Sequence, residues 1–204
     1  MHLKKYRQGF SASFKGWGER SWKGLILVGA LSAGLSGCFS GGETEPNEPL
    51  AQPLNSPSRL ENQQTNVEIT VPAEWISAGS DLRGSADIYA SYPARDLYAS
   101  VLSESDTTLE QFSLEDNADK YRWLIEEELD AYNGSTKTTL NQVDGLPAVQ
   151  YEIRGQVDGT DVVYLHTTVR GEDSYYQVVG WTTADRYAEN KDTLQTVIQS
   201  FEGT

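Results

Sequence analysis

The stretch Pro147–Trp181, PAVQYEIRGQVDGTDVVYLHTTVRGEDSYYQVVGW, decides the fold of this 204-residue chain. Apolar and polar side chains alternate most cleanly over residues 147–154, as in a half-buried β-strand. Apolar runs follow over residues 162–170 and 175–181, and short loops containing Gly separate the runs. Strands joined by such short turns pair antiparallel, so we predict an antiparallel meander here.

Further strands are predicted on the N-terminal side of this meander. Val67–Val71 alternates apolar and polar residues, and Pro72 ends it because proline cannot donate to a strand ladder. Residues 86–92 and 97–103 are rich in Tyr, Val and Ile and flank Pro93, so we expect two neighbouring strands there.

Two amphipathic helices complete the pattern. Ser113 with Asp116 is a capping box in the broad sense, and Thr182 with Asp185 offers a second one. Apolar residues then recur at steps of three or four. They are Ala118, Tyr121, Ile125, Leu129 and Tyr132 in the first helix, and Tyr187, Leu194, Val197, Ile198 and Phe201 in the second.

The order of these elements indicates the fold class. We expect Asn133-Gly134 to end the first helix and residues 136–143 to form a strand after it. Runs of strands interrupted by helices, without a regular strand–helix–strand repeat, indicate an α+β fold. We predict a central, mostly antiparallel sheet of about six strands flanked by helices, an α/β/α sandwich.

The N-terminal segment predicts export and lipidation. Residues 1–37 hold six Lys or Arg against one acid, and they include the uncharged apolar residues 24–35, as a secretory signal does. A membrane span needs ~20 apolar residues, so twelve are too few. Leu35–Cys38 resembles the bacterial lipobox, in which a peptidase cuts before the cysteine and the cysteine carries diacylglycerol. We predict lipidation of Cys38, the only cysteine.

These signals divide the chain into three parts. Residues 1–37 are predicted to be a lipoprotein signal peptide, residues 38–66 the acylated cysteine with a disordered Pro- and Gly-containing tether, and residues 67–204 one α+β domain. Two or more acyl chains anchor a protein firmly. The expected location is therefore the extracytoplasmic face of a membrane, in the periplasm or a thylakoid lumen.

Charge argues against nucleic acid as a partner. The whole chain carries −14, and removal of residues 1–37, which carry a net +5, leaves −19. A chain this acidic does not neutralise phosphates in number, and anionic lipid surfaces repel it. The acidity either confers solubility alone or favours cations or a basic protein surface.

Three short motifs carry a family resemblance. They are Val71–Trp75 (VPAEW) after the opening strand, Val143–Ala148 (VDGLPA) before a Tyr-bearing strand, and Val197–Phe201 (VIQSF) at the end of the last helix. Their order and spacing, together with the lipobox, resemble the PsbP superfamily over about residues 66–202. This superfamily includes the photosystem II protein PsbP, its cyanobacterial relative CyanoP and DcrB-like bacterial lipoproteins.

The resemblance implies an antiparallel sheet between helical layers and a non-enzymatic accessory role at a membrane complex. The opening strand, Val-Glu-Ile-Thr-Val, departs from the aromatic-rich strand of photosynthetic members. This difference favours a general bacterial lipoprotein, with a photosystem II-associated protein as an alternative. A lipoprotein that binds a small ligand or a divalent cation is the other alternative, since some members of the superfamily bind divalent cations.

No motif predicts catalysis or a cofactor. His166 is the one histidine after residue 37, and no Gly-x-Ser-x-Gly elbow accompanies it. No paired His or Cys spacing predicts a metal site. Glu126, Glu127 and Glu128 with Asp119 fan out around a helix and are interpreted as a solvated face. We therefore expect no enzyme, no cofactor and no resident metal in a monomeric domain.

Aromatic residues give the candidate contact site instead. Most of them are expected in the core, because alternate strand positions point inward. Tyr164 shares a strand face with His166 and Arg170, and Trp123 shares a helix face with charged residues. The candidate partner-contact residues are therefore Trp123, Tyr164, His166 and Arg170, and at least one of Trp123 and Tyr164 should be exposed.

Overall fold

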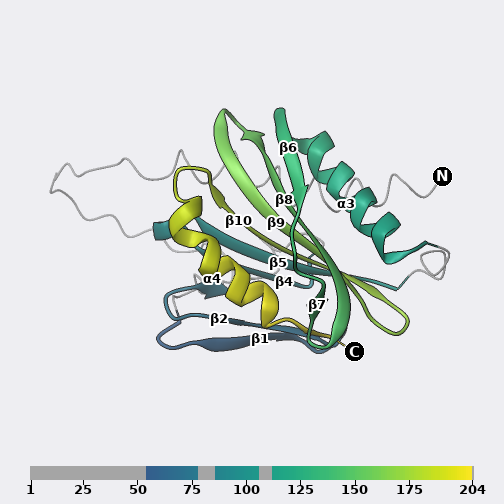
Figure 1. The fold of residues 1–204 in the computed structure, drawn as a ribbon. Helices are drawn as coiled ribbons and strands as arrows, with labels where there is room; N and C mark the ends of the chain where they lie inside the picture. Colours follow the sequence, from purple (N-terminus) through teal and green to yellow (C-terminus); the bar gives the residue numbers. More distant parts are fainter. Residues whose placement is uncertain (1–53, 78–85, 106–111, 204) are drawn as a thin grey trace, which may run out of the picture.

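The computed structural model describes residues 54–77, 86–105 and 112–203, and it has the predicted α+β fold (Figure 1). The helices are α3 (Leu114–Glu128), α4 (Tyr187–Gln199) and the 3-10 turn η1 (Pro93–Arg95). The strands are β1 (Ser58–Asn62), β2 (Val67–Val71), β3 (Ile76–Ser77), β4 (Ile88–Tyr92), β5 (Leu97–Glu104), β6 (Ala131–Lys137), β7 (Gln142–Val143), β8 (Leu146–Val157), β9 (Thr160–Arg170), β10 (Tyr175–Thr183) and β11 (Glu202–Gly203).

A large antiparallel sheet forms the centre, in the order β3-β4-β5-β10-β9-β8-β6, with β7 paired to β8. The predicted meander is confirmed, because β8, β9 and β10 are neighbours in sequence order. Asp158 and Gly159 make the β8–β9 turn with φ angles of 50° and 75°. Such left-handed angles suit Asp-Gly, which explains why this dipeptide fixes the register of the hairpin.

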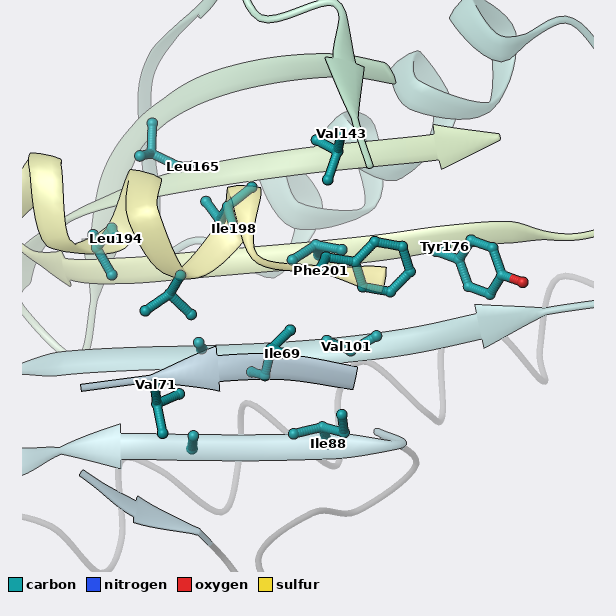
Figure 2. Close-up of a cluster of buried hydrophobic side chains, with 14 of the residues drawn as sticks. Ile69, Val71, Ile88, Val101, Val143, Leu165, Tyr176, Leu194, Ile198 and Phe201 are labelled. Atoms are coloured by element: carbon teal, nitrogen blue, oxygen red, sulfur yellow. The ribbon is translucent and has the colours of Figure 1, made fainter. Parts of the chain in front are cut away.

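Helix α4 and a second, three-stranded sheet cover one face of the large sheet. The small sheet has the order β1-β2-β11. Figure 2 shows Ile69 of β2 beside Val101 of β5 and Val71 farther along β2, with Leu194 and Ile198 of α4 above these strands. All five side chains are buried, so this layer is held to the sheet by apolar packing.

Helix α3 covers the opposite face, over β8 and β9 (Figure 1). Trp181 lies at the centre of an aromatic group on this face. Its ring centroid is 5.5 Å from that of Tyr98, 5.9 Å from Tyr89 and 6.1 Å from Tyr164. Both faces of the sheet are therefore covered, and β10 is buried along nearly its whole length.

Coverage of both faces corrects one inference from the alternating pattern. Val149 and Ile153 are buried as expected, but Gln150 on the opposite face is buried as well, with 2% of its surface exposed. Gln150 Nε2 donates to Thr167 Oγ1 of β9 over 2.9 Å, which satisfies the amide inside the protein. Gln150, whose position was predicted to face solvent, is thus buried on the other covered face of the sheet.

The ordered domain begins earlier than predicted. Residues 58–62, assigned to the tether from their polar composition, form β1 and pair with β2. Leu54 also exchanges backbone hydrogen bonds with the segment after β2, through Trp75 O at 2.9 Å and Glu74 N at 2.8 Å. The predicted boundary at residue 66 is therefore wrong, since a strand with one apolar residue is stabilised by its partner strand.

The end of the first helix also differs from the prediction. Helix α3 stops at Glu128, and Asn133-Gly134, expected to end it, lies inside β6. The pairing of β6 with β8 is irregular between Tyr132 and Gly134, where the chain has a bulge. The strand expected over 136–143 is therefore divided between β6 and β7.

The second predicted capping box does not form. Helix α4 begins after Arg186, which makes no side-chain capping bond. Thr182 lies in β10, and its hydroxyl accepts a hydrogen bond of 2.8 Å from Asn190 Nδ2. Asn190 also donates to Arg95 O, so α4 is tied to the sheet and to η1 at this point.

Gly155 provides a test of how closely α3 approaches the sheet edge. A Cβ added there would lie 2.5 Å from Ala131 O and 2.5 Å from Leu129 Cδ1. We expect Gly155→Ala to lower the free energy of unfolding by about 1–3 kcal/mol in urea titrations, because a backbone atom would have to move. Gly180→Ala is the control. Its Cβ would lie 3.2 Å from Leu194 Cδ2, so a smaller effect is expected, and equal effects would contradict the account.

Candidate docking surface

The sequence at the start of α3 fixes where this helix begins. Ser113 Oγ accepts a hydrogen bond from Asp116 N over 3.1 Å, and the Asp116 carboxylate accepts from Ser113 N over 3.2 Å. The predicted capping box is thus confirmed. Hydrogen bonds from the Ser113 side chain and backbone lower the pKa of Asp116, so the carboxylate stays charged at the positive end of the helix dipole.

Polar contacts, as well as apolar ones, hold α3 to the sheet. Tyr121 donates a hydrogen bond to the Glu104 carboxylate of β5. Tyr151 of β8 donates to Asp119 Oδ1 over 2.7 Å, and the Arg122 guanidinium lies 5.4 Å from the Tyr151 ring centre. Burial and the bond to Asp119 raise the pKa of Tyr151 to about 12. The phenol therefore remains a donor over the physiological range.

His166 lies at the centre of this buried layer. Its Nε2 is 2.8 Å from Gln177 Oε1, which also accepts from Thr168 Oγ1 over 2.7 Å. The imidazole stacks on the Tyr121 ring of α3 with a centroid distance of 5.9 Å. Within the described residues, His166 Nδ1 and Gln177 Nε2 have no hydrogen-bond partner. The layer is packed, but its hydrogen bonding is incomplete.

Burial controls the charge of His166. Removal from water, and to a lesser extent the nearby Arg122 cation, lowers the pKa of His166 to about 4, although the bond to Gln177 opposes this. The imidazole is therefore neutral at pH 7. A neutral imidazole stacked on Tyr121 acts as a packing element between α3 and the sheet.

Two of the four predicted contact residues are excluded from the surface. Tyr164 and His166 each have 0% exposure, because α3 covers the face of β9 that they share. The shared face was predicted correctly, but its assignment to the surface was wrong. Alternation along a strand shows which residues face the same way and not whether another element covers them.

Trp123 is exposed, in agreement with the prediction that at least one of Trp123 and Tyr164 is exposed. The exposed fraction is 48% for Trp123, 47% for Phe112 and 45% for Tyr132. These are the three exposed large hydrophobic residues in the described ranges. Trp123 points outward from α3, and Phe112 directly precedes this helix.

Tyr132 lies on the same side of the molecule. It pairs in register with Gly155 of β8, and the missing Cβ of Gly155 would contact Leu129 at the end of α3. Tyr132 and Gly155 therefore face the α3 layer, since paired residues share a face of the sheet. We define the α3 surface as Phe112, Trp123, Tyr132 and the exposed residues of α3 between them.

The α3 surface is acidic. Helix α3 has six acidic and two basic side chains, a net charge of −4. Arg122 is engaged by Asp119 and Glu126 of the same helix. The carboxylates of Glu127 and Glu128 make no ion pair or hydrogen bond within the described part of the chain. The surface therefore combines exposed aromatic rings with carboxylates that are available to a partner.

Arg170, the fourth predicted contact residue, is exposed at the end of β9. Its cross-strand neighbour is Tyr175, whose hydroxyl donates to Phe112 O over 3.0 Å. Arg170 thus lies near the Phe112 end of α3. The structure brings Trp123 and Arg170 to one side of the molecule, and their role in contact remains a prediction.

Sequence reasoning missed Phe112 and Tyr132. Tyr132 was assigned to the core stripe of the first helix because it follows Leu129 by three residues. The helix ends before it, so that spacing has no meaning there. Phe112 precedes the capping box by one residue, and a large apolar residue outside a helix cap is a signal that could have been used.

The remaining features concern lipidation, membrane spans and metal ligands. Cys38, the predicted lipidation site, lies outside the described residues. Within the described ranges, no helix is long and apolar enough to cross a membrane, and no three His, Cys, Asp or Glu side chains are grouped as metal ligands would be.

Comparisons with known proteins show what the fold resembles. No family model and no curated protein matches the chain by sequence. The solution structure of the cyanobacterial PsbP protein (CyanoP) from Synechocystis sp. PCC 6803 is similar, with a TM-score of 0.55 and 16% identity over 80% of this chain and 98% of that chain. LpqN of Mycobacterium tuberculosis is similar with a TM-score of 0.50 and 13% identity, over 72% of this chain and 90% of its own. The chain therefore has a PsbP-like fold, as the motifs predicted.

The buried histidine predicts acid sensitivity. The pKa of His166 is about 4 in the folded protein and near 6.5 in the unfolded chain, so the unfolded chain binds the proton first as pH falls. The stabilisation is complete above pH 6.5 and is lost towards pH 4, by about 3 kcal/mol. Urea titrations at several pH values should show the stability advantage of the wild type over His166→Gln shrinking by about this amount. Parallel pH profiles of the two proteins would contradict the assignment.

Proposed function

We propose that this chain is a lipid-anchored, extracytoplasmic accessory protein that docks through its α3 surface on a membrane protein complex. The observation that carries the proposal is the exposure of Trp123 on α3, together with that of Phe112 just before this helix and Tyr132 just after it. Aromatic side chains exposed together, with polar residues around them, are typical of protein contact sites.

The environment of His166 supports a non-enzymatic role. A histidine base needs access to a substrate and usually a carboxylate that orients it. His166 is fully buried, and its Nε2 is occupied by Gln177. Its neutral, stacked ring serves packing better than proton transfer.

The proposed location at the outer face of a membrane rests on the sequence around Cys38 and on the fold. The lipobox-like Leu35–Cys38 follows an apolar stretch that is preceded by basic residues. Two proteins with this fold are a cyanobacterial PsbP and LpqN, which is involved in cell envelope biogenesis in Mycobacterium tuberculosis. An accessory protein at the outer face of a membrane is consistent with both.

A binding role for a small polar ligand is the second candidate. His166 Nδ1 and Gln177 Nε2 lack partners in the described part of the chain and could bind such a ligand, but only if α3 moves away from the sheet, because both residues are buried. A photosystem II-associated role is a narrower form of the first proposal and is favoured by the likeness to CyanoP. The acidic composition leaves a divalent cation as a further ligand class for the second candidate.

Lipidation is tested at Cys38. We expect Cys38→Ser to abolish incorporation of labelled palmitate and to leave an uncleaved or released form, because the sulfur that receives diacylglycerol is lost. Membrane fractions and intact mass of the protein from its native cells measure both effects. Labelling that persists in the variant would disprove the anchor.

Docking is tested by photocrosslinking in native membranes. Benzoylphenylalanine in place of Trp123 should give an adduct with a membrane protein, whereas the same probe in place of Asp192 should not. Both positions are exposed, but Asp192 lies on the outer side of α4, where no large hydrophobic residue is exposed in the described chain. Adducts from both positions, or from position 192 alone, would reject the α3 surface as the docking site.

A further inference from the structure

We infer that the partner presents a cationic, arginine-bearing protein segment that lies along the outer row of α3. This inference rests on the proposed function and specifies the chemistry of the partner at the same surface. It depends on three features of α3: the position of Trp123, the carboxylates around it, and the placement of the helix's two cations away from Glu127 and from the Trp123 ring.

The outer row of α3 consists of residues spaced by three or four, which lie in line on a helix. It runs through Asp116, Asp119 and Lys120 to Trp123 and Glu127. Residues 116, 119, 123 and 127 are exposed and Lys120 is half-buried. The indole therefore stands in the middle of the row, with carboxylates one turn away on both sides.

Internal contacts use some of these charges and leave others. The Asp116 carboxylate caps the helix, and Asp119 accepts a hydrogen bond from Tyr151. The Glu127 carboxylate makes no ion pair or hydrogen bond within the described residues. The carboxylate one turn after Trp123 in the outer row is thus available to a cation from outside.

The two basic side chains of α3, Arg122 and Lys120, contact groups other than Trp123 and Glu127. Arg122 lies between Asp119 and Glu126 and over the Tyr151 ring. Lys120 Nζ lies 5.9 Å from the Phe112 ring centre. Within the described residues, no ammonium or guanidinium group makes a cation–π contact with the Trp123 ring, so its exposed face is open to a partner.

Arginine fits this combination better than other side chains. A guanidinium stacks on an indole face and at the same time donates hydrogen bonds to a carboxylate. Trp123 and Glu127 are four residues apart, so one arginine can reach both. The group formed by Arg122, Tyr151 and Asp119 at the side of α3 already shows this chemistry within the protein.

An anionic lipid surface does not fit the same row. Helix α3 carries −4, and the predicted mature chain carries −19. Both repel a negatively charged membrane. Helix α4 offers a contrast within the same protein, since Glu189, Lys191 and Asp192 give it a net charge of only −1 and its outer side has no exposed aromatic residue.

The test uses the full-length lipoprotein in native membranes, with benzoylphenylalanine at position 123 as the probe. Glu127→Lys should lower the yield of adduct at least fivefold, because it places a cation against the partner's cation. Asp192→Lys makes the same change of charge on α4 and should alter the yield less than twofold. Mass spectrometry of the adduct should locate the crosslink within a segment of net positive charge that contains arginine.

The outcomes separate the two proposals. An adduct with a membrane protein in a neutral or acidic segment, unaffected by Glu127→Lys, overturns this inference and leaves the docking role intact. An adduct with lipid overturns the inference in favour of a bilayer surface. The absence of any adduct from position 123, combined with unchanged co-isolation of the complex by Trp123→Ala, overturns both. Trp123→Ala, followed by co-isolation of the complex, adds a second measure, with about a tenfold loss expected if the indole is an anchor.

Discussion

The stability of the large sheet depends on coverage of both its faces. One covering layer is held by apolar packing, and the other also by polar contacts. Strands β9 and β10 are buried almost from end to end, so neither face tolerates water. On one side, Leu194, Val197 and Ile198 of α4 pack with the small sheet in a continuous apolar core. On the other side, α3 meets a smaller apolar cluster beside a layer of hydrogen-bonded polar groups.

The apolar attachment of α4 and the partly polar attachment of α3 differ in their response to pH and in how they orient each helix. Apolar packing is insensitive to pH, whereas the α3 layer contains a buried imidazole and a buried carboxylate that are costly to charge or leave unpaired. The outer side of α3 also carries the exposed Trp123, while the outer side of α4 is polar. The helix that carries the exposed Trp123 is therefore the one held to the sheet by oriented polar contacts. Such contacts fix the position of a helix more specifically than apolar contacts do.

The sequence predicted the parts of the fold that follow from local periodicity. The β8–β10 meander, the capping box at Ser113 and the apolar stripe of α4 all depend on residues close in sequence. Features that depend on distant partners were missed. Polar β1 is ordered by pairing with β2, and Tyr164 and His166 are buried because α3 crosses their strand. Of the candidate site, Trp123 and Arg170 were placed correctly on the surface, whereas Tyr132 needed knowledge of where α3 stops.

The two ends of the ordered domain meet in the small sheet. Strand β2 lies between β1 at the start and β11 at the finish, and Ser200 Oγ contacts both Thr70 N and Thr70 O. The chain therefore enters the globule on the α4 side, opposite the helix that carries Trp123 (Figure 1). If residues before Leu54 tether the domain to a membrane, as we propose, the tether joins the domain on the side away from Trp123 and leaves the α3 surface uncovered.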